Sequence, residues 1–533
     1  MRTVLIRPTN PSGSAYLTKW GFLPAPLGLL QLAGELQRLD NSSIRIIDME
    51  AESMTVERVL DEISAFRPDM IGITIHATAA HGTSCEIARR VNQRFPDTVI
   101  VAGGHHATFL PNDLLREGFD IVVLGEGDFT FAEIASAVDA GTDLGLIPGI
   151  VYKAKGKFVR TGRRGLIEDL DTLAFPALEL IDASKYTFSV FGKESRVLCL
   201  ETSRGCPYAC DFCSVTPTWG NKWRNKSNAR IIEEMHNAEK FGYDWIFFTD
   251  DIFIVFPNTK QRALLFRSMM DNGFDFRWIV QMRADVTAKN PELIRKGAEA
   301  GMSVAFMGIE SGSQEILRKM HKGIFTPQSV DAVRILSGNG VIVLCGMMIG
   351  APYERLRDMI TTVRFSNKLA DAGADAVQFS IYTPLPGTRV FDDALRNGRL
   401  FTLDWDRYDV LTPVMKTKVH PAVVQLVQFY ANYSFYVRKY LLSKMGRRAV
   451  HERKEKLVSD ATRFIFEMMP EYIRDITKFP AQLIRTSRLY ASLARNAGIA
   501  KDAVAELMEN SNSVIYLQKP GTANPYFRIK QEQ

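Results

Sequence analysis

Short apolar runs alternate with amphipathic stretches over the first 150 residues. Five of these runs have the length and composition of buried strands, at residues 3–6, 44–48, 70–75, 98–102 and 121–124. The stretches between them, such as 27–38, 56–66 and 84–95, repeat apolar positions with the period of a helix. This alternation predicts an α/β, Rossmann-like doubly wound parallel sheet over residues 1–150, a fold that binds ligands at the carboxyl ends of its strands.

A second series of strand and helix patterns begins near residue 196. Strands are expected at residues 197–201, 245–249, 278–282, 304–308, 341–349 and 376–381, with helices between them such as 229–241, 259–272 and 326–339. Six such units predict a partial (β/α)6 barrel over residues 196–410, and barrels of this kind carry their chemistry at the carboxyl ends of the strands. Residues 151–195 contain a short hairpin pattern and are expected to connect the two domains.

Residues 411–533 differ from the rest of the chain because they are helical, aromatic and basic. Aromatic residues interleave here with Arg438 and Lys439; they are Phe429, Tyr430, Tyr433, Phe435, Tyr436 and Tyr440. We expect a helical domain that caps the barrel mouth and helps to set the substrate. The alternative is that the aromatic residues are core residues at helical spacing.

Length and composition limit the classes of protein that need to be considered. A chain of 533 residues is long enough for about three domains. The net charge of +6 is spread along the chain and does not indicate nucleic-acid binding. There is no uncharged apolar run of about 18 residues, and the first apolar stretch is too short for a signal peptide. We therefore expect a cytoplasmic protein without a transmembrane segment.

Three of the six cysteines, Cys206, Cys210 and Cys213, fall within eight residues directly after an expected strand. In a reducing cytosol such clustering favours metal ligation over disulfides. A 4Fe-4S cluster normally takes four cysteines, and Cys199, the nearest other one, lies inside the preceding strand. One iron would then stay open to a small ligand, as at a catalytic metal centre. The alternatives are an electron-transfer cluster or a zinc site, but zinc would require a fourth ligand, and none follows before His236.

The loop from Cys206 to Cys213, with an aromatic residue before its last cysteine, resembles the defining motif of the radical SAM superfamily, named for S-adenosylmethionine (SAM). The resemblance covers residues 196–400 with five separate motifs. It implies that the three cysteines hold a 4Fe-4S cluster whose open iron chelates SAM. It also implies that Phe212 lies beside the adenine of SAM.

Further SAM contacts are implied at the ends of the following strands. Asp250 and Asp251 would receive the methionine ammonium group, because carboxylates suit an ammonium. Arg283 would bind the methionine carboxylate with its planar fork. Glu310, followed by Ser311, lies in a strand end that resembles the ribose-binding one of the family. The alternatives are helix capping for the aspartates and a surface ion pair for the arginine.

A doubly wound domain placed before such a core resembles the cobalamin-binding class of the superfamily. The similar residues follow the fourth and fifth expected strands; they are Gly103, Gly104, His105, Gly125, Glu126 and Gly127. Glycines at these places let the backbone approach a large planar cofactor and its tail. The alternative is a docking domain that binds no cofactor.

No histidine occurs in the loop of residues 8–14, where some cobalamin domains supply an axial ligand. The resemblance therefore implies a cofactor bound without a histidine from this loop. His76 and His81, after the third expected strand, are candidates for its lower face, although a loop histidine is more often ordinary surface. We expect His105 and His106 to pack near the cofactor tail rather than to bind metal.

The two resemblances together imply a cobalamin-dependent radical SAM C-methyltransferase. In such anaerobic enzymes a 5′-deoxyadenosyl radical activates an sp3 carbon and methylcobalamin donates the methyl group. The alternatives are a cyclase or rearrangement enzyme of the anaerobic Mg-protoporphyrin cyclase type, and a non-enzymatic cobalamin or redox sensor. A protein side chain, a lipid and a tetrapyrrole are the substrate classes left open. The resemblance also implies an external electron donor of the ferredoxin or flavodoxin type, and no nucleic-acid partner is expected.

Overall fold

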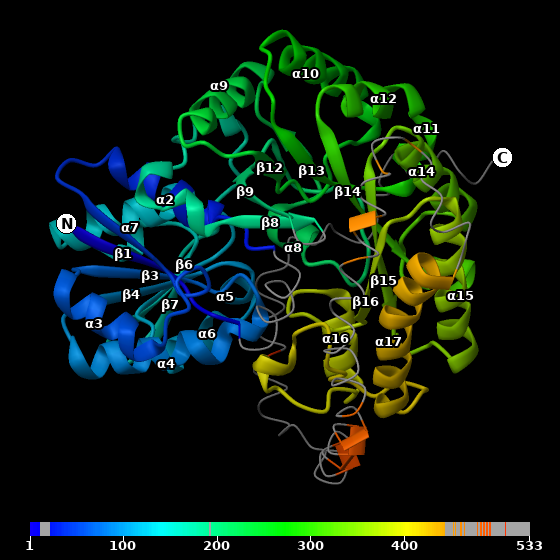
Figure 1. Ribbon diagram of the computed structural model, residues 1–533. Coiled ribbons are helices and arrows are strands. Elements are labelled where there is room, and N and C mark those ends of the chain that lie inside the picture. The colour runs from blue at the N-terminus through cyan, green and yellow to red at the C-terminus, as the bar shows by residue number, and fades with distance from the viewer. Residues whose placement is uncertain are drawn as a thin grey trace.

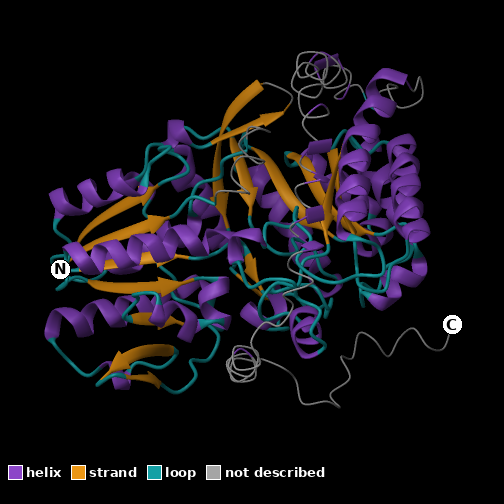
Figure 2. Ribbon diagram, turned by 90° about the horizontal axis from the view of Figure 1, so that it is seen from below, coloured by secondary structure: helices purple, strands orange, loops and turns teal. Residues whose placement is uncertain are grey.

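The computed structural model describes residues 1–10, 22–190 and 193–442, together with isolated positions between 451 and 507. Within these residues the chain forms two units, each built on a seven-stranded sheet. Figure 1 shows the units side by side, the first in blue and cyan and the second in green and yellow. The turned view of Figure 2 shows helices along the faces of the first sheet and around the second.

The first sheet has the strand order β2-β1-β3-β4-β5-β6-β7. Its parallel strands are β1 (Arg2–Arg7), β2 (Ser43–Asp48), β3 (Met70–Thr74), β4 (Val99–Gly103) and β5 (Ile121–Val123). A hairpin of β6 (Ile150–Ala154) and β7 (Lys157–Arg160) continues the sheet antiparallel to β5. All five expected strands are confirmed, and the hairpin belongs to this sheet rather than to a free connector.

Helices cover both faces of the first sheet. One face is covered by α2 (Leu27–Gln37) and α7 (Asp128–Ala140), the other by α3 (Val56–Phe66) and α4 (His81–Arg94). Two short helices, α5 (His105–Phe109) and α6 (Pro111–Arg116), follow β4. The alternation of side chains along a strand explains the two cores. In β1, Val4 and Ile6 pack with α3 and α4, whereas Leu5 packs with α2 and α7.

The second sheet has the strand order β16-β15-β14-β13-β12-β9-β8. Its parallel strands are β9 (Lys193–Leu200), β12 (Trp245–Phe248), β13 (Arg277–Met282), β14 (Met302–Glu310), β15 (Ile342–Ile349) and β16 (Ala376–Ile381). The partial (β/α)6 barrel is therefore confirmed. The edge strand β8 (Thr187–Val190), which pairs antiparallel with β9, was not expected, so the connector supplies strands to both sheets.

Helices alternate with the strands of the second sheet. They are α9 (Asn228–Glu239), α10 (Thr259–Asp271), α11 (Ala284–Lys289), α12 (Pro291–Glu299), α13 (Gln314–Lys319), α14 (Thr326–Gly338), α15 (Leu356–Ala372) and α16 (Arg389–Arg396). The core beneath them is aromatic: the buried Trp278 ring lies 5.7 Å from Phe248 and 5.5 Å from Phe266, between ring centroids. Burial of such large rings contributes much of the stability of this unit.

Helix α17 (Pro421–Tyr436) lies along β16, at the open edge of the second sheet (Figure 1). Its polar side chains satisfy the unpaired backbone of that strand. Asn432 accepts from the amide of Phe379 (3.0 Å), Gln428 donates to the carbonyl of Phe379 (2.9 Å), and the Tyr436 hydroxyl donates to the carbonyl of Val377 (2.9 Å). An exposed edge would invite pairing with another chain, and this helix prevents it.

This placement corrects the expectation that the C-terminal helices cap the barrel mouth, as far as the described residues reach. Phe435, Tyr436 and Tyr440 are buried, so these three are core residues, as the alternative interpretation predicted, whereas Tyr430 is 58% exposed. A π-helical turn (Val437–Leu442) follows α17. Most of the predicted domain beyond residue 442, and positions 11–14 of the first loop, lie outside the described residues.

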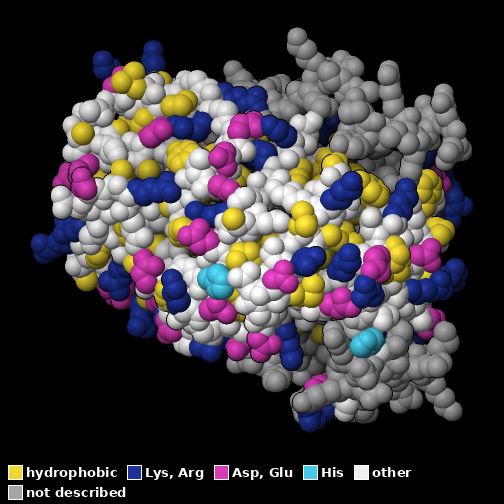
Figure 3. Space-filling model, turned by 90° about the horizontal axis from the view of Figure 1, so that it is seen from above, with side chains coloured by type: hydrophobic (Ala, Val, Ile, Leu, Met, Phe, Trp, Pro, Cys, Tyr) yellow, Lys and Arg dark blue, Asp and Glu magenta, His cyan; other side chains and the backbone are white. Residues whose placement is uncertain are grey.

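Charged side chains of both signs are mixed on the face drawn in Figure 3. No helix in the described part of the chain has the length and hydropathy needed to cross a bilayer.

Candidate active site

The three clustered cysteines lie in the loop that joins β9 to the short helix α8 (Val215–Trp219). Gly205 gives this loop its turn, with φ of +88°. A Cβ at that position would lie 2.4 Å from the carbonyl oxygen of Lys222, so glycine is required. The amide of Cys213 donates to the carbonyl of Cys210 (3.2 Å), and the Thr216 hydroxyl donates to the carbonyl of Tyr208 (2.9 Å). These bonds fix the loop before any metal is added.

The three cysteines are half-buried free thiols. Burial, together with the nearby thiol of Cys210, raises the pKa of Cys206 to about 12. Burial and the two neighbouring thiols also raise the pKa of Cys213. Thiolates crowded in this way are stabilised by a metal. Cys199 is buried within β9, so the donor set of this loop is three thiols, which fits a 4Fe-4S cluster with one iron free of a protein ligand.

Asp250, at the end of β12, is fully buried and hydrogen-bonded within the protein. Its carboxylate accepts from the amide (3.1 Å) and hydroxyl (2.5 Å) of Thr202 and from the hydroxyl of Ser203, and it faces Arg262 at 3.5 Å. These contacts tie β12 to the start of the cluster loop. The oxygens of Asp250 thus hold the loop, and a contact of this carboxylate with the SAM ammonium stays a prediction.

Asp251 is the carboxylate of this pair that faces the cysteines. Burial, together with Asp250 and Glu201, raises its pKa to about 7. Its charge also bears on the thiols of Cys206 and Cys213. Burial disfavours the ionised form of this carboxylate, and a cationic ligand beside it would stabilise that form. Asp251 therefore remains a candidate for the SAM ammonium.

Arg283, at the end of β13, packs against the cluster loop. Its guanidinium carbon lies 3.6 Å from the ring centroid of Tyr208, and its Nε donates to Asp285 (3.1 Å). One terminal nitrogen donates to the carbonyl of Lys322 (2.8 Å). The side chain is 6% exposed, so Arg283 is a buried pair with Asp285 and not the surface ion pair considered as the alternative.

Glu310 ends β14 with φ of +67°, an uncommon conformation for a residue other than glycine, and such strained residues concentrate at functional sites. Lys322 donates to its Oε1 at 2.6 Å. The same lysine nitrogen lies 5.7 Å from the ring centroid of Phe212. Lys322 therefore lies between Glu310, predicted to bind the ribose, and Phe212, predicted to lie beside the adenine. Ser311 does not share this orientation: its fully buried hydroxyl lies 3.0 Å from that of Thr362 and positions α15 instead.

Phe212 packs next to Tyr382, with ring centroids 6.0 Å apart. Tyr382 follows β16, is 2% exposed and belongs to the aromatic cluster that also contains Tyr353. Tyr382 is therefore a core residue that supports the Phe212 ring.

The predicted cobalamin loops lie at the carboxyl edge of the first sheet. A Cβ on Gly103 would have no atom within 4 Å, so open space lies in front of this backbone. Gly104 has φ of +100°, and a Cβ there would meet the carbonyl carbon of Ile75 at 2.9 Å. Gly125 has φ of +73°, and its amide donates to the Thr108 hydroxyl (3.0 Å). Open backbone at one glycine and close packing at the next fit a loop shaped for a large ligand.

His105 joins this loop to the cluster segment. Its Nδ1 lies 3.1 Å from the Thr218 hydroxyl in α8, and its ring lies 5.9 Å from Trp219. Burial lowers the pKa of His105 to about 3, and burial also lowers the pKa of His76, whose ring is 4.9 Å away. His76 nevertheless exposes much of its surface. The predicted cofactor edge and the cluster loop thus face each other.

Glu126 links the two units through ion pairs. Its carboxylate accepts from Arg204 (3.2 Å) and Arg224 (2.9 Å) and from the amide of Ile167 (2.7 Å). Arg204 also binds Asp128 with two hydrogen bonds, of 2.8 and 3.1 Å. Three donors already hold this buried carboxylate, so Glu126 has a structural role whether or not it also contacts cobalamin, and that contact stays a prediction. Gly127 precedes α7 as its N-cap.

Several functional contacts were missed from the sequence. Lys322 was not predicted as a site residue, because its ion pair with Glu310 forms only when the chain returns after α13. Arg262 donates to the Thr202 hydroxyl (2.7 Å) from α10, where it reads as a surface residue of a helix. The one signal in the sequence is indirect: a buried Asp250 would need a cationic partner, and Arg262 is that partner.

Two families match the chain in the order that the structure shows. The B12 binding domain matches residues 13–135, and the radical SAM superfamily matches residues 200–366. An uncharacterized methyltransferase of Pyrococcus horikoshii is 35% identical over 453 residues, which are 83% of this chain and 94% of that protein. The chain therefore belongs to the radical SAM enzymes that carry an N-terminal cobalamin-binding domain.

Two further similarities bear on fold and activity. The anaerobic magnesium-protoporphyrin IX monomethyl ester cyclase of Rubrivivax gelatinosus is 26% identical over 83% of this chain and 78% of its own length. The structure of the cobalamin-dependent SAM radical enzyme OxsB, with aqua-cobalamin and SAM bound, superposes with a TM-score of 0.66. It is 15% identical and covers 93% of this chain and 84% of its own, so it supports the fold.

Proposed function

We propose that this protein is a cobalamin-dependent radical SAM C-methyltransferase. The observation that carries the proposal is the direct contact between the two cofactor edges. The loop after β4 reaches α8 through His105 and Thr218, and the loop after β5 reaches the cluster loop through Asp128 and Arg204. A methyl donor and a radical source held on these two loops would share one substrate space.

The residues that would hold each group follow from the site. Cys206, Cys210 and Cys213 would bind three irons of the cluster, and the glycine loops after β4 and β5 would cradle cobalamin. When bound, the cluster with SAM supplies a 5′-deoxyadenosyl radical and cobalamin supplies a methyl group. The protein contributes alignment and exclusion of water.

Some residues in this proposal would contact SAM directly, and others would position the loop that carries the cysteines. Asp251 would meet the ammonium group and Arg283 the carboxylate, since the charge of Asp251 acts on the thiols of Cys206 and Cys213 and the guanidinium of Arg283 packs on Tyr208 of the cluster loop. Glu310, oriented by Lys322, would accept the ribose hydroxyls, and Phe212 would pack against the adenine. Asp250 and Arg262 act one step further away, because they position the loop that carries the cysteines.

The test is a reaction of the reconstituted full chain with SAM, cobalamin and a low-potential reductant, supplied with an extract of a strain that lacks the gene. Methylation predicts that 5′-deoxyadenosine and S-adenosylhomocysteine both form when the extract is added. Deoxyadenosine without S-adenosylhomocysteine would contradict methylation and favour the cyclase type, which the similarity to the Rubrivivax enzyme keeps as the second candidate. Neither product with any extract would favour a sensor.

The remaining parts of the proposal concern partners and place. We propose a cytoplasmic enzyme that receives electrons from a ferredoxin- or flavodoxin-type donor. Its substrate would be a protein side chain, a lipid or a tetrapyrrole. Mass spectrometry of the deletion strain for a missing methyl group would distinguish the three classes.

A further inference from the structure

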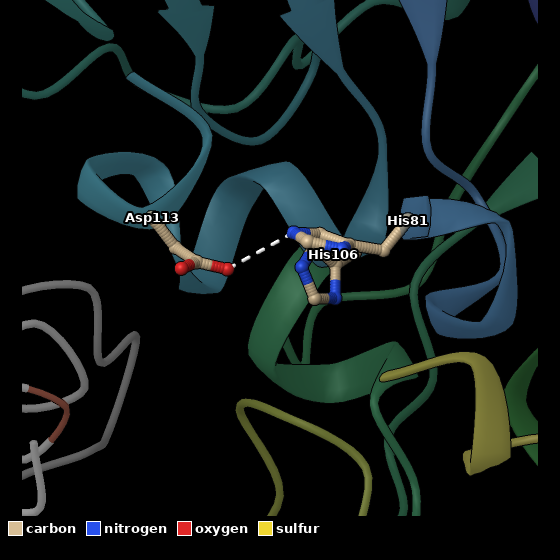
Figure 4. Close-up of side chains that lie close together, drawn as sticks. All are labelled: His81, His106 and Asp113. Atoms are coloured by element: carbon tan, nitrogen blue, oxygen red, sulfur yellow. Dashed lines mark ion pairs between the residues drawn. The ribbon is translucent and has the colours of Figure 1, made fainter. Parts of the chain in front are cut away.

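Two histidines and an aspartate lie together on the first unit, directly after the loop of Gly103 and Gly104, and they point to a metal site where His106 was expected only to pack near a cofactor. His81 begins α4, His106 lies in α5 and Asp113 lies in α6. Figure 4 shows the carboxylate of Asp113 turned toward the imidazoles, with the His106 ring beside that of His81. Nε2 of His81 is 3.0 Å from Oδ2 of Asp113, and one ligand atom from each of the three residues lies within 4.8 Å of the other two.

His106 is the residue that an ordinary ion pair does not explain. It is 1% exposed, and among the residues that the structure describes neither of its ring nitrogens has a hydrogen-bond partner. Its neighbours are the rings of His81 (5.0 Å) and Trp405 (5.4 Å), between centroids. A buried imidazole with both nitrogens unpaired is costly, and an absent ion or water is a recognised reason for such a group. An ion pair between His81 and Asp113 alone would leave both nitrogens of His106 unpaired, so the free-energy cost of burying them would remain.

We propose that His81, His106 and Asp113 bind a divalent zinc-class ion. Two imidazoles and one carboxylate are a common protein donor set for zinc. Ligand atoms about 2.1 Å from one tetrahedral ion are about 3.4 Å apart. Nε2 of His81 and Oδ2 of Asp113 already lie 3.0 Å apart, and the ligand atom of His106, within 4.8 Å of the other two, would move toward them by up to about 1.4 Å when an ion binds. A water molecule would complete the coordination.

The surroundings favour a structural role for this ion. Trp405, from the second unit, donates its indole N–H to Oδ2 of Asp113 (3.1 Å). Asp406, beside it, accepts from the amide of Gly82 (3.0 Å) at the start of α4. An ion bound to Asp113 would therefore stiffen the place where the second unit docks on the first, and the negative charge of Asp406 nearby would favour a cation.

The test measures zinc on the full chain after its cluster has been reconstituted, so that iron occupies the cluster cysteines. After chelator treatment and addition of zinc alone, the unmodified chain should retain about one zinc ion. His106→Gln and Asp113→Asn should each weaken zinc binding at least about tenfold, since even the loss of an outer-sphere partner has effects of that size. Zinc should also raise the melting temperature of the unmodified chain and of neither variant.

His236→Gln is the matched control, because His236 forms an exposed pair with Glu239 (2.9 Å) outside this group. This variant should bind zinc as the unmodified chain does. Asp113 is one-third exposed, so Asp113→Asn keeps the test available if His106→Gln does not fold. Equal zinc content in the unmodified chain and in a folded His106→Gln or Asp113→Asn variant would overturn the proposal, as would the absence of zinc from the unmodified chain.

Discussion

Arg204 is the residue on which the contact between the two units depends most strongly. It lies two residues before Cys206 and makes two hydrogen bonds to Asp128, one to Glu126 (3.2 Å) and one to Glu201 (2.8 Å). The substitution Arg204→Met keeps an unbranched side chain of similar length but removes the charge. Asp128 would then be buried without its hydrogen-bonded arginine, and Glu126 would keep Arg224 and the amide of Ile167.

The expected loss follows from the burial of the network. Arg204 and Asp128 are each about 5% exposed, and removing one partner of a buried ion pair costs about 3–5 kcal/mol. Native domains are stable by only about 5–15 kcal/mol, so this is a large fraction. Urea unfolding of the chain at pH 7 measures the loss, and iron content after reconstitution measures its effect on the cluster loop. We expect both to fall.

Two further variants make this measurement specific. Arg295→Met removes an arginine that pairs with Glu292 and Glu299 on the surface, and it should unfold at nearly the same urea concentration as the unmodified chain. Adding Asp128→Asn to Arg204→Met should recover part of the stability, because the unpaired charge is then gone. If Arg204→Met unfolds like Arg295→Met, the reasoning that the buried network holds the units together is wrong.

Other predictions concern the cofactor loops and acid stability. Cys210→Ala should abolish the cluster absorption and SAM cleavage while the circular dichroism spectrum stays unchanged. Gly103→Leu should weaken cobalamin binding without loss of stability, whereas Gly104→Ala should destabilise the fold by about 1–3 kcal/mol, because its φ is +100° and its Cβ would meet Ile75; equal effects of the two in binding and urea titrations would contradict this. Although burial pushes the pKa of Asp128 upward, Arg204 lowers it below the usual value. The stability contributed by Asp128 should therefore be present above about pH 4 and be lost as the pH falls further, and unfolding curves of Asp128→Asn should lack this loss.

The sequence predicted the two sheets well because their signals are local. The buried faces of β1 alternate residue by residue, and every strand predicted for the two sheets was found with its ends no more than four residues from the predicted ones. The cluster loop was predicted for the same reason, since the spacing of Cys206, Cys210 and Cys213 is a short-range pattern.

The contacts between units could not be predicted in this way. Glu126 reads as part of a glycine-rich cofactor loop, but Arg204, its partner, lies 78 residues later. Asp250 reads as a ligand at a strand end, and only the fold shows that Thr202 uses its carboxylate. Helix α17 reads as a cap for the barrel mouth, but the unpaired edge of β16 fixes it elsewhere, and a sequence does not show which sheet edge is open.

The most direct test of the proposed activity needs no substrate. The reconstituted chain is incubated with cobalamin, a reductant and SAM that carries a deuterated methyl group, and the cobalamin is recovered for mass spectrometry. A methyltransferase of this class predicts deuterated methylcobalamin together with an equal amount of S-adenosylhomocysteine. A chain that holds both the cluster and cobalamin but leaves the cobalamin unlabelled would contradict the account.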